Sequence, residues 1–326
     1  MVRRQMLQGM IASGIMLVLI LDGQTALQGA SQGLQLCMKA VIPSLFPFFV
    51  LSNLITNSLF GGPLLFLQPF ARLCRIPRGA ECLLVPAFLG GYPTGAQSVY
   101  QAYQAGNLSR QSALRLMAFC NNAGPAFLFG MVSSLFPNQW YVWSLWLIHI
   151  ISAILTSFTI PNAQTDAVPL TSSEGISVSQ ALASALRTTA LVSGWVILFR
   201  ILIAILNRWL FWIFPLEMQV ILIGFMELTN GCAALHDIED LNLRFLICSV
   251  ILAFGGGCVI MQTMSAIHDL PIQTYLSGKA KQVLFSLILS AAFLSKQIVP
   301  IALLLAGALL LQKCKNKSGF HRILHV

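Results

Sequence analysis

Four short clusters of Gly, Pro, Asn and Glu interrupt the most apolar parts of this sequence. Two lie in the first half, at Gly90–Gly95 (GGYPTG) and Ala118–Pro125 (AFCNNAGP), and two in the second, at Glu227–Gly231 (ELTNG) and Gly255–Gly257 (GGG). Gly and Pro weaken a helix, and each break frees backbone amides and carbonyls from their usual partners. In lipid such groups persist only where protein buries them or where they line a polar cavity. The clusters therefore predict a binding site for a small polar solute at membrane depth.

The charged residues inside apolar runs allow several roles. Glu227 is the one acid in the middle of such a run, and it could bind a proton, a cation or a donor group of a solute. Alternatively it pairs with Arg200, which could itself hold an anionic solute. Lys39 is close enough to a helix end to extend its ammonium to the interface. His149 is expected to be a hydrogen-bonded packing residue, since no second His is near it.

The composition excludes a soluble globular protein. Of 326 residues, 57% are hydrophobic and 9% are charged, and the mean hydropathy is +0.79. Because so few charged side chains cannot cover the surface of a soluble protein, we expect a lipid bilayer to surround most of the chain. The net charge of +9 comes from basic residues between apolar stretches, including the pair Lys279 and Lys281. It indicates membrane topology rather than nucleic-acid binding.

Enzyme chemistry is not expected. The sequence has no H-E-x-x-H, G-x-S-x-G or Walker A motif, which argues against catalysis and against ATP-driven pumping within this chain. The eight cysteines are scattered, without C-x-x-C spacing, and are interpreted as small apolar packing residues. We therefore expect no cofactor and no metal.

The apolar stretches predict an all-α, polytopic membrane protein with about seven to nine membrane helices, since each is near the ~20 residues that a bilayer core requires. They run over 6–24, 36–60, 82–104, 112–136, 139–160, 188–214, 217–236, 243–267 and 282–312. The predicted organisation is an N-terminal helix (1–35), a first membrane repeat (36–160), a linker (161–187), a second repeat (188–280), and a C-terminal helix with a basic tail (281–326).

The two halves resemble each other around the breaks, because each cluster of the first half has a counterpart at nearly the same offset in the second. Basic loops flank 82–104 on both sides, which favours a re-entrant hairpin there rather than a crossing. The same interpretation makes 217–236 a second hairpin, entering from the opposite face after three crossings (112–136, 139–160 and 188–214). It leaves open whether 282–312 crosses once or turns back, and so which side holds the C-terminus.

Five motifs together resemble the YlbJ (SpoVV) family of sporulation integral membrane proteins. They are Val41–Asn53 (VIPSLFPFFVLSN), Gly90–Ala96, Phe119–Pro125, Glu227–Gly231 and Phe254–Gln262, and their order and spacing match from about residue 35 to 280. The resemblance implies a Gate, or nucleoside-recognition, domain, a fold similar to concentrative nucleoside transporters, and movement of dipicolinic acid across the outer forespore membrane. This chain is shorter than the family pattern in its linker and C-terminal region.

The breaks and buried charges together give the predicted substrate site. Its members are Gly91, Tyr92, Pro93, Thr94, Gly95, Asn121, Asn122, Arg200, Glu227, Thr229, Asn230, Gly255, Gly256 and Gln262. Half-helix N-termini, Asn amides and an Arg would suit a flat dianion such as dipicolinate, while the Asn, Thr and Glu side chains would suit a nucleoside equally. A membrane scaffold or sensor for spore assembly, without transport, is the competing class. The coupling ion and homo-oligomer formation stay open.

Overall fold

The computed structural model describes residues 2–62, 64–161, 175–297 and 307, and over these residues the chain is all-helical. The α-helices are α1 (Val2–Leu21), α2 (Gly23–Leu36), α3 (Ile42–Leu59), α4 (Gln68–Cys74), α5 (Thr94–Gln104), α6 (Arg110–Met117), α7 (Pro125–Gly130), α8 (Gln139–Thr159), α9 (Val178–Trp209), α10 (Leu216–Met226), α11 (Leu228–Ala234), α12 (Leu241–Phe254), α13 (Gly256–Ala266) and α14 (Gln273–Leu294). Short turns of 3-10 helix lie at Glu81–Leu83, Val132–Leu135, Phe211–Ile213 and Leu235–Asp237, and π-helical turns lie at Cys37–Val41 and Pro86–Gly90.

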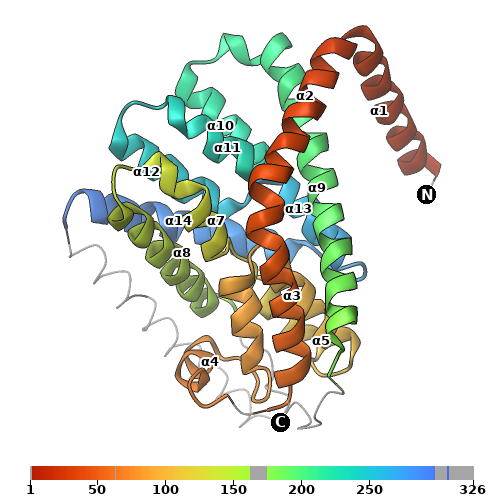
Figure 1. Cartoon of the computed structure of the whole chain (residues 1–326). Helices are drawn as coiled ribbons and strands as arrows, with labels where there is room; N and C mark the ends of the chain where they lie inside the picture. The colour runs from red at the N-terminus through yellow and green to blue at the C-terminus, as the bar shows by residue number, and fades with distance from the viewer. Residues whose placement is uncertain (1, 63, 162–174, 298–306, 308–326) are drawn as a thin grey trace.

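One helical rod runs from Gly23 to Leu59, because the π turn Cys37–Val41 joins α2 to α3 without a bend out of line (Figure 1). Pro47 lies inside this helix and cannot donate a backbone hydrogen bond. Pro43 at the start of α3 also lacks the N–H that would pair with the carbonyl four residues earlier, which lies within the π turn Cys37–Val41. The rod continues through residue 35, at which the sequence predicted that an N-terminal helix ends. The helix is interrupted at Asp22 instead.

The rod packs along α9, and both lie side by side in Figure 1. Gly29 and Gly33 make this possible, since a Cβ on Gly29 would lie 2.9 Å from Ile201 Cα and one on Gly33 would lie 3.0 Å from Ile197 Cα. Small residues four apart allow helix backbones to approach in this way. This pair of helices forms one wall against which the broken helices pack.

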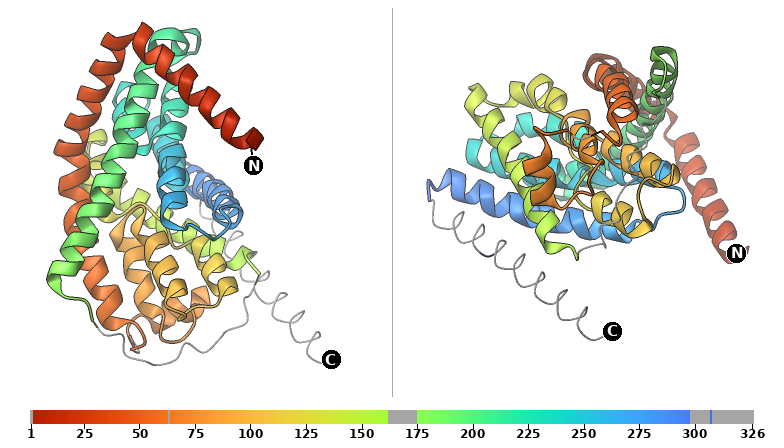
Figure 2. Two further views of the ribbon diagram at one scale, coloured as in Figure 1. Left: turned by 90° about the vertical axis from the view of Figure 1, so that its right-hand side faces the viewer. Right: turned by 90° about the horizontal axis from the view of Figure 1, so that it is seen from below.

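Behind this wall α8, α12 and α14 pack against one another (Figure 2). A hydroxyl cluster joins two of them, since Ser249 and Ser286 lie 2.6 Å apart and Ser290 donates to Ser249 at 2.7 Å. Arg244 at the start of α12 donates to the carbonyls of Leu135 (2.7 Å) and Ile238 (2.9 Å). These bonds fix the loops at one end of the layer.

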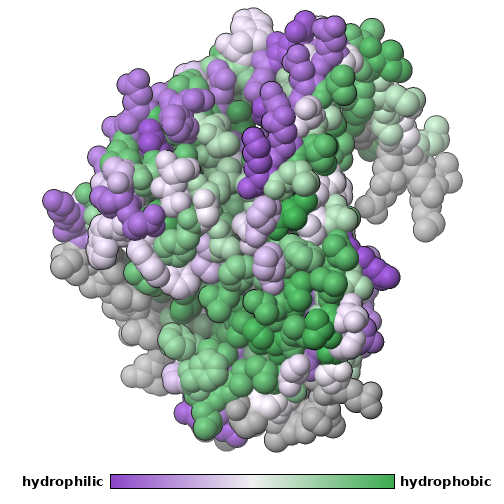
Figure 3. Space-filling view, viewed as in Figure 1, coloured by the Kyte–Doolittle hydropathy of each residue, from purple (hydrophilic) through white to green (hydrophobic). Residues whose placement is uncertain are grey.

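The structure has four helices that are long and apolar enough to cross a membrane, among the residues that it describes: Gly23–Leu59, Gln139–Thr159, Val178–Trp209 and Leu241–Ala266. Shorter apolar helices lie at Ala12–Leu21, Glu81–Gly90 and Leu216–Met226. Green, apolar side chains cover much of the face in Figure 3 where α3 lies, and polar ones gather toward the opposite end. The predicted all-helical membrane class is confirmed.

Three further sequence boundaries differ from the structure. The stretch 112–136, predicted as a crossing, is divided into α6, a non-helical segment at Ala118–Gly124 and α7, because Gly124 and Pro125 start a new helix. Helix α9 begins at Val178, within the predicted linker 161–187, where Ser177 and Gln180 form a capping box. Helix α14 crosses the predicted boundary at 280. Residues 162–174 of the linker and 298–306 and 308–326 of the C-terminal region lie outside the described residues.

Candidate functional site

The first break lies at Gly91–Pro93, between the π turn Pro86–Gly90 and α5. Gly91 has a φ of +81°, which only Gly adopts readily, and its carbonyl accepts both the backbone N–H (2.9 Å) and the hydroxyl (2.5 Å) of Thr94. Thr94 therefore closes the turn with its side chain rather than pointing it at a solute. Gly95 lies one residue further, where α5 packs directly on the backbone of Cys120.

The second break, Ala118–Gly124, carries two fully buried amides. Asn122 Nδ2 donates to the carbonyls of Phe119 (2.7 Å) and Ala87 (3.1 Å), and its Oδ1 accepts from Gln282 Nε2 (2.9 Å). Asn121 Nδ2 donates to Thr263 Oγ1 at 3.0 Å. The two amides thus satisfy the backbone groups that the breaks free, and they connect the first half to α13 and α14.

The third break contains Glu227, which is 2% exposed. Its carboxylate accepts from Thr229 N (3.0 Å), Asn230 N (2.6 Å) and Asn230 Nδ2 (2.6 Å), and so it caps α11. The predicted alternative of a pair with Arg200 is not formed, since no ion pair joins them among the described residues. Because the carboxylate occupies the start of α11, that helix end is not free to receive an anionic solute.

Arg200 was predicted as a site residue, but it lies outside the central site. Its guanidinium donates to Gln32 on α2, and it lines an outer groove of about 390 Å³ together with Asn207 and Asn230. The position of Arg200 on α9 turns it toward α2, whereas Val192 and Val196 of α9 turn inward. Residues 192, 196 and 200 are spaced four apart and share one face of α9, so what packs against each level of that face decides the difference: α2 lies opposite Arg200, and the cavity lies opposite Val192 and Val196.

The fourth break places Gly255 and Gly256 against the other breaks. Both have a positive φ, of +83° and +84°. A Cβ on Gly255 would lie 3.1 Å from the Tyr92 ring, and one on Gly256 would lie 3.2 Å from the Leu228 amide nitrogen. The structure therefore brings the third and fourth breaks together and sets the first against the fourth.

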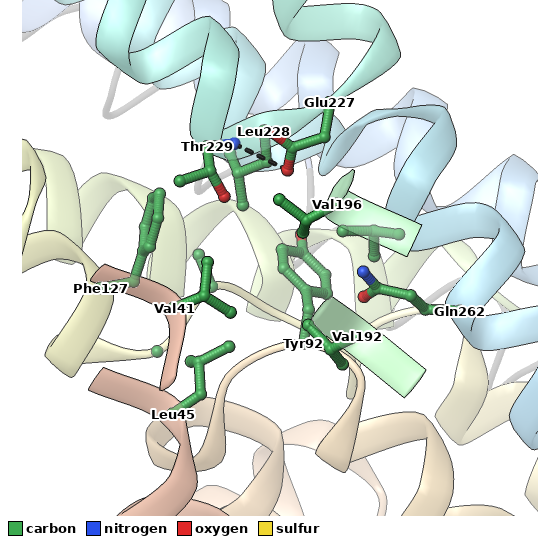
Figure 4. Close-up of a pocket in the computed structure, with 13 residues that line it drawn as sticks. Val41, Leu45, Tyr92, Phe127, Val192, Val196, Glu227, Leu228, Thr229 and Gln262 are labelled. Carbon is green, nitrogen blue, oxygen red and sulfur yellow. Dashed lines mark hydrogen bonds between the residues drawn. The ribbon is translucent and has the colours of Figure 1, made fainter. Parts of the chain in front are cut away.

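A small cavity lies where the breaks meet (Figure 4). It is lined by Val41, Leu45, Tyr92, Ala123, Gly124, Phe127, Val192, Val196, Glu227, Leu228, Thr229, Val259 and Gln262. Its volume is about 30 Å³, which has room for one or two water molecules. Of the predicted site residues, Tyr92, Glu227, Thr229 and Gln262 line it. In this conformation no solute the size of dipicolinate fits.

The other predicted residues support the cavity from behind or lie beside it. Gly91, Gly95, Gly255 and Gly256 allow close backbone approach, and Pro93 precedes α5. Larger openings lie nearby, including a groove of about 470 Å³ lined by Lys39, Pro43 and Ser44 of the rod. Lys39 is exposed at this groove, in agreement with the expectation that its ammonium extends outward.

Lys279 is the polar residue that sequence reasoning missed. It was assigned to a basic loop, but it lies on α14, is 0% exposed, and donates to Tyr92 Oη (2.9 Å) and Gln282 Oε1 (2.8 Å). The signal was present in the sequence. Tyr275, Lys279, Gln282, Ser286 and Ser290 recur at spacings of three and four, which place them on one face of a helix. That face is the buried one.

His149 belongs to the same buried group, as a packing residue. Its Nε2 accepts from Ala123 N at 3.0 Å, so the ring satisfies one more backbone amide of the second break. The prediction of a hydrogen-bonded packing histidine is confirmed. The described cysteines are buried free thiols, in line with the packing role expected of them.

An apolar helical fold with four helices able to cross a bilayer, and with interrupted helices around a buried polar cluster, defines a helical membrane protein. Over 297 residues the chain is 25% identical to the sporulation integral membrane protein YlbJ of Bacillus subtilis (strain 168), covering 77% of this chain and 72% of that protein. This similarity supports a YlbJ-like family for the chain, as the motifs predicted. No protein-family model matches the chain, and no solved structure matches it.

Proposed function

We propose that the chain is a secondary transporter of a small, polar, anionic solute, with dipicolinic acid crossing the outer forespore membrane during sporulation as the leading assignment. The observation that carries the proposal is that three of the breaks, drawn from both halves of the chain, border one small cavity, with the fourth directly behind it. Paired interruptions in corresponding halves are typical of transporter sites. The similarity to a sporulation membrane protein supports the biological setting.

The proposed architecture is an inverted repeat with two re-entrant hairpins and seven to nine membrane segments, similar to concentrative nucleoside transporters. Helices α10 and α11 support the second hairpin, since a Cβ on Gly231 of α11 would lie 2.2 Å from Gly224 Cα of α10. Two short helices whose backbones touch across Glu227 fold back on each other. The turn Gly91–Pro93 between Pro86–Gly90 and α5 supports the first hairpin.

The small volume of the cavity, about 30 Å³, supports a contracted, solute-free state of this transporter. Binding would require the apolar side chains on the rod side, Val41 and Leu45, to separate from Phe127. Gln262 would then supply an amide toward the solute, while Glu227 would hold the start of α11 in place beside it. The grooves near Lys39 and near Arg200 are wider, and each would serve as an approach to the cavity.

The experiment is uptake of labelled dipicolinate into proteoliposomes that contain the purified protein. Glu227→Gln removes the charge and places an amide against the α11 amides, and it is expected to reduce uptake about tenfold or more. Glu217→Gln is the matched control, since Glu217 is an exposed acid at the other end of α10. If the uptake of dipicolinate and of nucleosides equals that of empty liposomes for wild type and for every variant, the result would favour the non-transporting scaffold.

A further inference from the structure

A lysine side chain lies in the interior of this membrane protein without a carboxylate among its contacts in the described chain. Lys279 Nζ is 2.9 Å from Tyr92 Oη and 2.8 Å from Gln282 Oε1. Its nearest aromatic rings are those of Tyr92, with a centroid 4.8 Å away, and Tyr275, at 5.7 Å. All of these partners are neutral.

Such an arrangement is costly for a structural residue. A cation removed from water loses several kcal/mol of solvation unless an anion or a full set of acceptors replaces it. Two hydrogen bonds and two ring faces offset part of this loss. A methionine or leucine of similar size would pack in the same place without this loss of solvation. Packing alone therefore does not account for a lysine here.

Tyr92 connects this lysine to the cavity. Its ring lines the cavity, and its hydroxyl accepts from Lys279 while donating to the carbonyl of Leu252 at 3.1 Å. Lys279 itself does not line the cavity and therefore lies behind the Tyr92 ring. The cavity acid, Glu227, cannot serve as its partner in this conformation, since the amides of α11 hold its carboxylate.

We propose that Lys279 is the cation that compensates a carboxylate of the transported solute, with the Tyr92 ring separating the two until the cavity opens. The inference rests on the proposed function and adds to it the group that recognises the negative charge. The Gln282 side chain, which bridges Lys279 to Asn122, holds the ammonium in position. A neutral solute of the same shape gains nothing from this group.

The test compares two probes of equal shape, dipicolinate and its uncharged diamide, pyridine-2,6-dicarboxamide. Binding to the purified protein and uptake into proteoliposomes are measured for wild type, Lys279→Met and Lys281→Met. Lys281 is the matched control, being two residues further on α14 and only partly buried. Lys279→Met is expected to weaken dipicolinate binding about ten- to hundredfold, the range for losing a charged hydrogen bond, without weakening diamide binding. Lys281→Met is expected to leave both unchanged.

Each outcome separates the two proposals. Wild type that transports neither probe contradicts the proposed function, whereas wild-type transport that Lys279→Met preserves contradicts only the role of Lys279. An equal fall for both probes would show that Lys279 supports the fold. If Lys279→Met does not give folded protein, the same two probes are compared on wild type and on Tyr92→Phe, which keeps the lysine. Both proteins are expected to bind dipicolinate more tightly than the diamide. Equal affinity for dipicolinate and the diamide overturns the inference.

Discussion

Substituting Gly95 by Ala tests how tightly the first two breaks are packed. A Cβ on Gly95 would lie 1.7 Å from the carbonyl oxygen of Cys120, 2.8 Å from its carbon and 3.1 Å from Asn121 Cα. All three are backbone atoms, so no side chain can rotate away to make room. The sequence predicted Gly95 as a member of the substrate site. The structure instead gives Gly95 a packing role, in the contact between α5 and the Ala118–Gly124 segment.

The size of the effect follows from these distances. An ordinary contact to the Cys120 oxygen requires the two segments to separate by roughly 1.5 Å, and overpacking of this kind costs about 1–3 kcal/mol. The separation also weakens the Asn121 contacts to Ala96 N (3.4 Å) and Thr263 Oγ1 (3.0 Å), each of which contributes about 1 kcal/mol. We therefore expect Gly95→Ala to lower the free energy of unfolding by about 3–5 kcal/mol.

The assay is equilibrium unfolding of the purified protein in mixed micelles, with Gly194→Ala as the control. Gly194 lies within α9, and a Cβ there would meet no atom within 4 Å. Gly194→Ala should leave stability unchanged or raise it by up to about 1 kcal/mol through helix propensity. Equal stability of the two variants would refute the close packing of α5 on the second break.

Two further predictions concern the ends of the helices. Arg244→Met leaves two backbone carbonyls without their donor and should lower the free energy of unfolding by about 1–3 kcal/mol, measured in the same micelles. A second change is expected with pH. The side chain of Asp22 accepts from Trp209 Nε1 at 3.0 Å and lies 3.1 Å from Arg208, and hydrogen bonding to Thr25, with these neighbours, lowers its pKa below the ordinary 3.8. A lowered pKa stabilises the fold above pH 3.8, and this stabilisation is lost as pH falls through the lower, folded-state value. Trp209 fluorescence should change over that range.

A matched variant serves as the control for each of these two predictions. Arg187→Met removes an exposed arginine of α9 and should leave stability unchanged, so a similar loss in both arginine variants would contradict the role of the Arg244 hydrogen bonds. Asp22→Asn should abolish the acid-dependent change at Trp209. A change of the same size in Asp22→Asn would assign it to another group.

The positions of the breaks were predictable because they depend on local chemistry. Gly91 and Gly255 adopt positive φ angles, and Pro125 starts a helix, so the residue types alone indicate where helices end. Glu227 was likewise recognisable as unusual from its apolar neighbours. Its role as the cap of α11 follows from the backbone amides two and three residues later.

The direction in which buried side chains point was not predictable in the same way. Arg200 and Val196 are one turn apart on α9, yet one faces α2 and the other lines the cavity. Lys279 was assigned to a loop because its charge was weighed without the polar side chains that follow on the same helical face. Burial of that face against Tyr92 is set by packing between segments 187 residues apart in the chain.

Solute counterflow tests the central claim most directly. Proteoliposomes loaded with unlabelled dipicolinate are placed in a trace of labelled dipicolinate, and internal label is followed over time. The account predicts a transient accumulation of label that empty liposomes lack and that Glu227→Gln reduces while Glu217→Gln retains it. Label entry at the rate of empty liposomes, with folded wild-type protein in the membrane, would contradict transport through the cavity where the breaks meet.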